Sequence, residues 1–312
     1  MGIKTISEIH INNRLTELLT IGAFDLKITT FVFGCFIKIS RMIVFPNAKI
    51  NLGLNIVSKR NDGYHNLETI FFPVNKWNDV LEVIPSTQNT DEFSVSGLKI
   101  DGAANNNLCL KALEYMRQHT SIPPLKIHLH KVIPFGAGLG GGSADAAFML
   151  KLLNEQFQKN FSYSVLEKMA ATLGADCPFF IKNQAVMARG IGNEFSEISL
   201  QLKSLWLLIV APGIHVSTAE AYGGIIPKSP SIPINAIITK PVEEWRKFLK
   251  NDFEDTVFRK YPAIADIKEN LYRNGAIYAS MSGSGSAVYG LFKDKPEIIW
   301  SSSYVTHLEE IS

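Results

Sequence analysis

The sequence has few cysteines and almost no excess charge. Its 312 residues include three cysteines, Cys35, Cys109 and Cys177, which form no CxxC pair and no zinc-type spacing. An odd number of widely spaced cysteines is typical of reduced thiols in a cytoplasmic protein and speaks against a disulfide scaffold. The formal net charge is +2. This balance gives no indication of nucleic acid or an acidic membrane surface as the main partner.

The sequence also lacks a long apolar run. The first apolar stretch is interrupted by Asp25 and Lys27, and the uncharged run Ile28–Ile37 is too short to span a bilayer. A polar segment opens the chain and no small-residue cleavage site follows, which argues against a signal peptide. A new pattern, MIVFPNAKINLGLNI, begins at Met42. We therefore expect residues 1–41 to be an N-terminal extension outside the fold, and one explanation for it is an incorrectly assigned start codon. The alternative is a genuine extension that packs on the domain.

Apolar residues recur at strand spacing in some segments and at helix spacing in others. The expected strands lie within 43–57, 68–85, 125–132, 179–189, 205–211 and 278–292. The expected helices are 107–119, 143–156, 163–173, 242–249 and 264–274, with a proline-rich loop at 227–233. Because these elements alternate without strict β–α–β order, we predict an α+β protein. Its length favours two domains, residues 42–200 and 201–312.

Five glycines lie between Gly136 and Gly142, directly before a helical pattern. Three of them satisfy GxGxxG, but a dinucleotide fold needs a first strand that is buried on both faces. The strand expected before this loop carries Lys126, His128 and His130 on one face. A P-loop needs a lysine before the serine, and here Gly142 precedes Ser143. Neither motif fits.

The physical interpretation that remains is a phosphate cradle. A glycine loop that leads into a helix offers unpaired N–H groups and the positive end of the helix dipole. Ser143 and Asp145 fall in the expected first turn, where both residue types favour a helix start. A glycine-rich turn with a capped helix and no ligand is the alternative. The alanines that follow favour the cradle, because small side chains leave room for a ligand.

The stretch PFGAGLGGGSADAA resembles motif 2 of the GHMP kinase superfamily, with Ala144 where many relatives carry a second serine. Pro46–Leu52 (PNAKINL) resembles the first motif of this superfamily, and Ser280–Val288 (SMSGSGSAV) resembles the third. The resemblance runs from about Met42 to Phe292. It implies a two-domain α+β fold with the active-site cleft between the domains, and an ATP-dependent small-molecule kinase that needs Mg²⁺.

Further segments resemble one branch of this superfamily. They are Asp62–His65 (DGYH), Leu173–Pro178 (LGADCP) and Pro212–Tyr222 (PGIHVSTAEAY). This branch phosphorylates the 2-hydroxyl of 4-diphosphocytidyl-2-C-methyl-D-erythritol in the non-mevalonate route to isoprenoids. A kinase of homoserine or mevalonate and a non-catalytic nucleotide-binding protein on the same fold are the alternatives.

The resemblance assigns Asp176 as the catalytic base that accepts the proton of the attacking hydroxyl. Lys49 would be its partner, because a fixed ammonium stabilises charge on the transferring phosphoryl group. Asn51 lies two residues further along the same expected strand, so it shares a face with Lys49 and is assigned to substrate orientation.

The remaining assignments concern the two ligands. Tyr64 and Tyr222 are expected to sandwich the cytosine ring and His65 to meet its edge, with Thr218 also in the substrate site. The expected ATP-binding residues are Pro134, Phe135, Gly136, Ala137, Gly138, Leu139, Gly140, Gly141, Gly142, Ser143 and Ala144. No metal-ligand motif is present, so phosphate oxygens and water would supply most of the Mg²⁺ shell. Cys177, His128 and His130 are expected to have no catalytic role.

Overall fold

The computed structural model describes residues 43–99, 106–157 and 159–312. The expected extension, residues 1–41, and Cys35 within it lie outside the described residues. Of the three sheets in the described part, the first is built in the order β1 (Ile43–Val44), β4 (Val80–Pro85), β6 (Leu125–Lys131), β5 (Glu92–Gly97). Strand β6 alternates as expected: Leu125, Ile127 and Leu129 are buried, whereas Lys126 is exposed.

The second and third sheets each have four strands. The second has the order β2 (Asn47–Lys59), β3 (His65–Asn78), β7 (Val186–Arg189), β8 (Glu194–Glu197). The third has the order β10 (Tyr278–Met281), β11 (Val288–Phe292), β9 (Trp206–Ala211), β12 (Val305–Glu310), and all its pairs are antiparallel. The apolar strand β9 is central in this sheet, as expected for a strand without a polar face.

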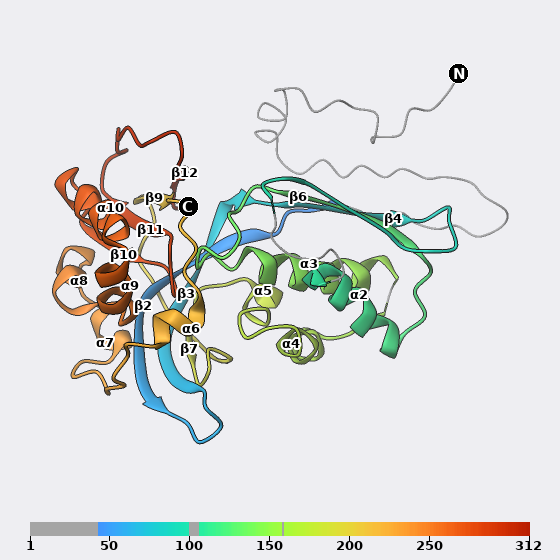
Figure 1. The fold of residues 1–312 in the computed structure, drawn as a ribbon. Helices are drawn as coiled ribbons and strands as arrows, with labels where there is room; N and C mark the ends of the chain where they lie inside the picture. The colour runs from blue at the N-terminus through green and yellow to red at the C-terminus, as the bar shows by residue number, and fades with distance from the viewer. Residues whose placement is uncertain (1–42, 100–105, 158) are drawn as a thin grey trace. The chain divides into compact units, whose positions relative to one another are not determined.

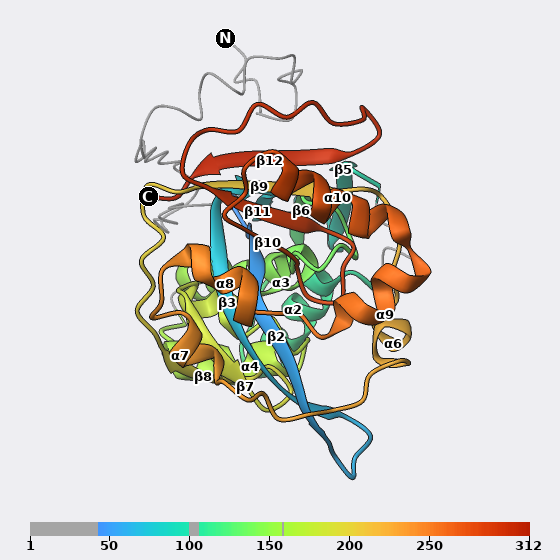
Figure 2. The ribbon, with the colours of Figure 1, turned by 90° about the vertical axis from the view of Figure 1, so that its left-hand side faces the viewer.

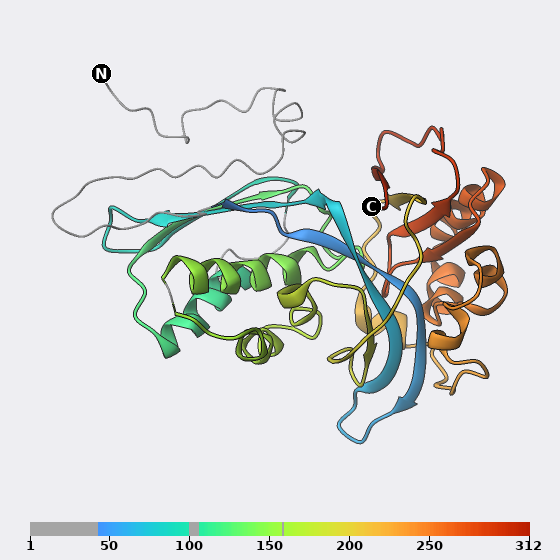
Figure 3. The same cartoon turned by 180° about the vertical axis from the view of Figure 1, so that it is seen from behind.

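The helices divide between the sheets. Those that share a core with β4 and β6 are α2 (Leu108–His119), α3 (Gly141–Gln156), α4 (Tyr163–Ala171) and α5 (Phe179–Lys182), seen beside that sheet in Figures 1 and 3. Those on the side of the third sheet are α6 (Thr218–Tyr222), α7 (Ile234–Ile237), α8 (Val242–Phe248), α9 (Phe253–Lys260) and α10 (Pro262–Arg273), with α10 in front of β9 and β11 in Figure 2.

The long, bent hairpin β2–β3 links these layers (Figure 3). Residues of β2 belong to two hydrophobic clusters. Ile50 is in the cluster that contains Leu207 and Trp245, whereas Ile56 is in the cluster that contains residues of α9 and α10. The pairing with β3 shifts register between Leu52 and Leu54, and Gly53 there has φ +66°. A Cβ on Gly53 would lie 2.4 Å from Leu249 Cδ1, so glycine permits both the bulge and the close packing.

One predicted element is wrong. The segment 179–189 was expected to be a single strand, but Phe179–Lys182 forms helix α5 and the strand begins at Val186. Pro178, with φ −60°, starts the helix, and Asn183 ends it in the left-handed conformation with φ 55°. A short apolar run such as FFI fits a buried helix as well as a strand, so periodicity could not separate the two.

The α+β prediction is confirmed, and helix α3 begins at Gly141, two residues before the expected start. The boundary expected near residue 200 falls between β8 and β9 and stays a prediction. Within the described residues, no helix is both long and apolar enough to cross a bilayer.

Candidate active site

Lys49 and Asp176 meet in the structure. Lys49 is on β2, and Asp176 is on the turn between α4 and α5. The Lys49 Nζ atom lies 3.2 Å from Asp176 Oδ2 and 2.6 Å from Asn51 Oδ1. The lysine side chain is 4% exposed and the aspartate side chain is 33% exposed. The ammonium is therefore fixed by two oxygen acceptors, while the carboxylate remains open to a ligand.

The glycine loop lies directly beside this pair. The backbone N–H of Lys49 donates to the carbonyl oxygen of Leu139 at 2.9 Å, which joins the loop to β2. Gly140 adopts φ +70° immediately before α3, and no side chain caps the N-terminus of this helix. The N–H groups of the first turn have no intrahelical acceptor, and they form the positive end of the helix dipole. This end of α3 is able to bind a phosphate group.

The third glycine-rich segment holds the loop in place. The Ser282 hydroxyl accepts from the backbone N–H of Asn51 at 3.2 Å and donates to the carbonyl oxygen of Gly138 at 2.8 Å. A Cβ on Gly138, where φ is +77°, would lie 2.0 Å from the carbonyl oxygen of Ser282. One buried hydroxyl thus joins the strand that carries Lys49 to the loop, and the close approach requires glycine.

Asp145 does not face the phosphate cradle. Its carboxylate is buried and lies 2.7 Å from Lys131 Nζ, which also contacts Asp79. Asp79 Oδ1 accepts from the backbone N–H groups of Val132 and Ile133 at 2.6 and 2.9 Å. Burial, together with the Asp79 charge, raises the pKa of Asp145 to about 7 despite the attraction of Lys131. This cluster joins the first turn of α3, through Asp145, to the end of β6, through Lys131.

Sequence reasoning missed this cluster, although a signal was present. The buried face of β6 carries Leu125, Ile127, Leu129 and then Lys131. A lysine that continues a buried apolar face needs an anionic partner in the core. Burial disfavours the charged lysine, yet Asp145 and Asp79 together raise the pKa of Lys131.

Two of the three aromatic residues assigned to the substrate, His65 and Tyr222, are in contact with each other. The rings of His65 and Tyr222 are stacked, with centroids 4.7 Å apart and an interplanar angle of 21°. Tyr64 is 62% exposed and stacks on no other ring among the described residues. Burial, then the charge of Asp176, raises the pKa of Tyr222. We expected an open face of Tyr222 on which the cytosine could stack, but the His65 ring covers that face.

The structure also places three other residues singled out from the sequence. The Thr218 hydroxyl lies 3.5 Å from the Ser284 hydroxyl, next to the segment that holds the glycine loop. Phe135 in the loop is 55% exposed. Cys177 is buried, and burial raises the pKa of its thiol to about 12. A thiol with this pKa is mostly protonated at neutral pH and is a poor nucleophile.

The family can now be stated from comparison with known proteins. The family model for the GHMP kinases N terminal domain matches residues 107–184, and the model for the GHMP kinases C terminal domain matches residues 234–301. The chain belongs to the GHMP kinase family. The chemistry of this family is ATP-dependent phosphotransfer to a small molecule, which agrees with a phosphate cradle beside a lysine–aspartate pair. The two matches lie on either side of the predicted domain boundary.

Two similar proteins are named as kinases of the same cytidyl substrate, and a third is a mevalonate kinase. The 4-diphosphocytidyl-2-C-methyl-D-erythritol kinase of Bacteroides thetaiotaomicron is 54% identical over 267 residues, which cover 84% of this chain and 97% of the relative. The crystal structure of a 4-(cytidine 5'-diphospho)-2C-methyl-D-erythritol kinase has a TM-score of 0.69 at 32% identity, covering 80% of this chain and 90% of that one. The crystal structure of the Methanococcus jannaschii mevalonate kinase has a TM-score of 0.57 at 17% identity. The match covers 82% of this chain and 92% of the mevalonate kinase chain, so the two share a fold.

Proposed function

We propose that this protein transfers the γ-phosphoryl group of ATP to the 2-hydroxyl of 4-diphosphocytidyl-2-C-methyl-D-erythritol, a step of the non-mevalonate route to isoprenoid precursors. The observation that carries the proposal is the 3.2 Å contact between Lys49 Nζ and Asp176 Oδ2, beside the loop that precedes α3. Relatives with high identity over most of the chain bear the name of this kinase.

In this proposal Asp176 orients the substrate hydroxyl and accepts its proton as the oxygen attacks phosphorus. Lys49 stabilises the charge that develops on the transferred group, and Asn51 fixes the lysine through the 2.6 Å contact to its side chain. The phosphates of ATP lie along residues 134–144 and against the N-terminus of α3. These roles require an accessible carboxylate and a fixed ammonium, and the Asp176 side chain is indeed partly exposed whereas the Lys49 side chain is buried.

The cytidyl head is assigned to Tyr64, His65, Thr218 and Tyr222. Since the His65 ring covers one face of Tyr222, we propose that the base displaces His65 from this face. His65 then reaches the polar edge of the base, and the exposed Tyr64 covers its other face. Homoserine and mevalonate have no base to stack, so this aromatic set favours the cytidyl substrate over the other two.

We also propose that ATP is used with Mg²⁺. Among the described residues, no three carboxylate, histidine or cysteine side chains gather in one place, and Asp145 is committed to Lys131. Phosphate oxygens and water would therefore form most of the shell, as is common for this ion. Bound there, Mg²⁺ would neutralise phosphate charge. The two described cysteines are free thiols, in keeping with our proposal that the enzyme works in the cytoplasm.

The test is a coupled assay of ADP release by the purified full-length protein with 4-diphosphocytidyl-2-C-methyl-D-erythritol, homoserine and mevalonate offered separately. We expect turnover with the cytidyl substrate and a kcat/KM at least about 100-fold lower with the other two, because they lack the base. Faster turnover of either competitor would assign the enzyme to another branch. Tight binding of ATP and cytidyl substrate without turnover would indicate a binding protein.

A further inference from the structure

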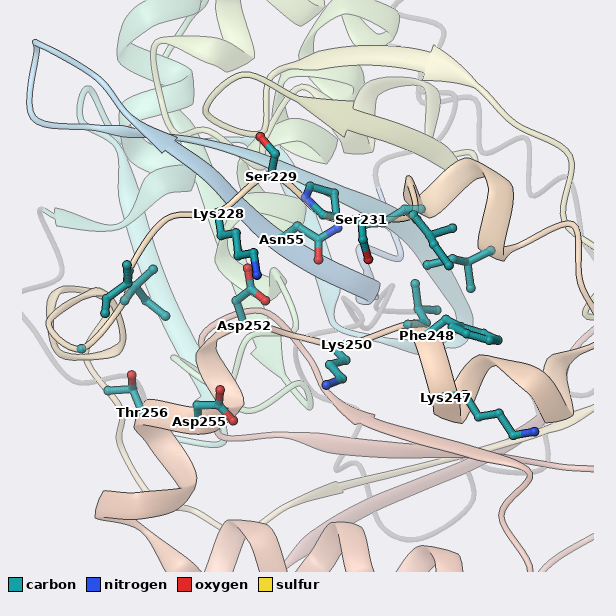
Figure 4. Close-up of a pocket in the computed structure, with 18 of the residues that line it drawn as sticks. Asn55, Lys228, Ser229, Ser231, Lys247, Phe248, Lys250, Asp252, Asp255 and Thr256 are labelled. Atoms are coloured by element: carbon teal, nitrogen blue, oxygen red, sulfur yellow. The ribbon is translucent and has the colours of Figure 1, made fainter.

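A pocket lies away from the proposed catalytic residues. It has a volume of about 620 Å³ and is formed by β2, by the loop that follows α6, by α7, and by the segment from the end of α8 into α9 (Figure 4). None of the residues assigned above to ATP or substrate lines it. Its residue on β2 is Asn55, six positions from Lys49, which is about 20 Å along an extended strand.

Backbone hydrogen bonds hold the walls of this pocket together. Strand β2 is at the edge of its sheet, and two segments cover its free edge. The N–H of Leu54 donates to the carbonyl oxygen of Lys250, and the N–H of Asp252 donates to that of Leu54, each at 2.8 Å. From the loop, the N–H of Lys228 donates to the carbonyl oxygen of Ile56 at 2.9 Å. The pocket is therefore built from segments whose backbones are already fixed.

The charges around this pocket are unbalanced. Its lining contains two carboxylates, Asp252 and Asp255, and four cations: Lys228, Lys247, Lys250 and Arg259. The Asp252 carboxylate already has a hydrogen-bond partner, since its Oδ2 accepts from the backbone N–H of Ile56 at 2.7 Å. Within residues 43–99, 106–157 and 159–312, no ion pair shorter than 4 Å involves any of the four cations. Four cations against two carboxylates leave the lining with an excess of positive charge.

The neutral part of the lining has two different sides. Figure 4 shows the Asn55 amide and the Ser231 hydroxyl on the same part of the lining, the Lys228 side chain directed toward Asp252, and Lys250 further along the pocket. These groups supply several N–H and O–H donors. The other side is apolar and is made by Ile232, Ile234, Ile237, Phe248 and Leu249. An apolar wall with a few converging donors is typical of a small-molecule site.

We propose that this pocket binds a phosphate ester with a short apolar chain. The three free oxygens of the phosphate match the ammonium groups of Lys228 and Lys250 together with the donors at Asn55 and Ser231. The chain then lies against Ile237 and Phe248. The proposal does not depend on the reaction catalysed at Asp176, because the two sets of residues do not overlap.

The test is titration calorimetry of the full-length protein with hexyl phosphate in saturating ADP, which fills the phosphate site at α3. We expect hexyl phosphate to bind one site, and inorganic phosphate to bind at least about tenfold more weakly because it lacks the chain. Hexyltrimethylammonium has the same chain and the opposite charge and is expected not to bind. Equal binding of this cation would contradict the proposal, and so would binding of hexyl phosphate that occurs without ADP and is lost when ADP is saturating.

A pair of variants locates the binding. Replacing Lys228→Met together with Lys250→Met keeps the aliphatic stems of two exposed side chains and is expected to weaken hexyl phosphate at least about tenfold. The matched control, Lys168→Met with Lys203→Met, removes two exposed lysines outside the pocket and is expected to change the affinity less than about twofold. Equal weakening by both double variants would show a general charge effect and overturn the proposal. Thermal unfolding of each variant verifies that it is folded.

Discussion

Two lysine–aspartate clusters flank the same glycine loop and differ in exposure. A Cβ on Gly140 would lie 3.1 Å from Lys49 Cγ, and a Cβ on the next residue, Gly141, would lie 3.3 Å from Lys131 Nζ. The aspartate beside Lys49 is 33% exposed, whereas the two beside Lys131 are 0% and 4% exposed. Neighbouring glycines therefore let one loop pack against two lysines, one at an open site and one in the core.

This comparison shows how exposure separates chemistry from structure. An ion pair that must accept a proton from a substrate has to leave its carboxylate accessible, as at Asp176. A buried ion pair cannot contact a substrate, but it holds together the elements that carry its two residues, here β6 and α3. We therefore expect changes at Lys49 or Asp176 to affect turnover, and changes at Lys131 or its partners to affect stability.

The largest expected effect is that of Asp176→Asn on turnover. The amide keeps the shape of the side chain and cannot accept the hydroxyl proton, so kcat should fall by about 10³- to 10⁴-fold. The affinity for ATP should change little, because the loop and α3 are intact. Steady-state kinetics and ATP titration measure both quantities. Retention of more than about a tenth of the wild-type kcat would show that Asp176 is not the base.

Lys131→Met should have the largest effect on stability. It leaves Asp79 and Asp145 buried without their cation, which is expected to cost about 3–5 kcal/mol of unfolding free energy. Lys126→Met, on the exposed face of the same strand, is the control and should change the value by less than about 0.5 kcal/mol. Urea unfolding measures both. Similar values for the two variants would mean that the buried cluster does not anchor the fold.

A smaller effect is expected from Tyr222→Ala. Loss of the ring removes a stacking face and should raise the KM for the cytidyl substrate about tenfold, while the KM for ATP stays within about twofold. Tyr222→Phe keeps the ring and should behave like the wild type. Initial-rate measurements with each substrate varied in turn separate these effects. A change confined to ATP would move Tyr222 to the nucleotide pocket.

The smallest effect is expected at Cys177, which is adjacent to Asp176. A thiol pKa of about 12, raised by burial, leaves little thiolate at pH 8, so iodoacetamide should not modify this cysteine in the native protein. The same treatment in denaturant should modify it fully. Peptide mass mapping gives the extent of labelling. Rapid labelling of the native protein would contradict both the burial and the packing role.

The sequence allowed prediction of features that depend on local order. Lys49 and Asn51 share a face of β2 because strand side chains alternate, and their 2.6 Å contact confirms that expectation. The loop before α3 was predictable because glycine clusters before a helical pattern have few structural uses. That Asp176 belongs beside Lys49 came from family resemblance, since 127 residues separate the two in the sequence.

Features that depend on contacts between distant segments were missed. The bridge from Ser282 to Asn51 and Gly138 spans 231 and 144 residues, and no local pattern reports it. The stacking of His65 on Tyr222 likewise joins two segments of unrelated periodicity. The short elements α9 and β12 were also missed. Short elements are stabilised mainly by packing on their neighbours, and their own periodicity is a weak signal.

A double-mutant cycle on kcat tests the central claim most directly. The wild type, Lys49→Met, Asp176→Asn and the double variant are compared in the same ADP-release assay at saturating substrates. If the two side chains act as one unit, the second change should cost little once the first is made, and the double variant should lie within about threefold of the slower single variant. A double variant whose loss equals the product of the two single losses would show that Lys49 and Asp176 act independently, and would contradict this account.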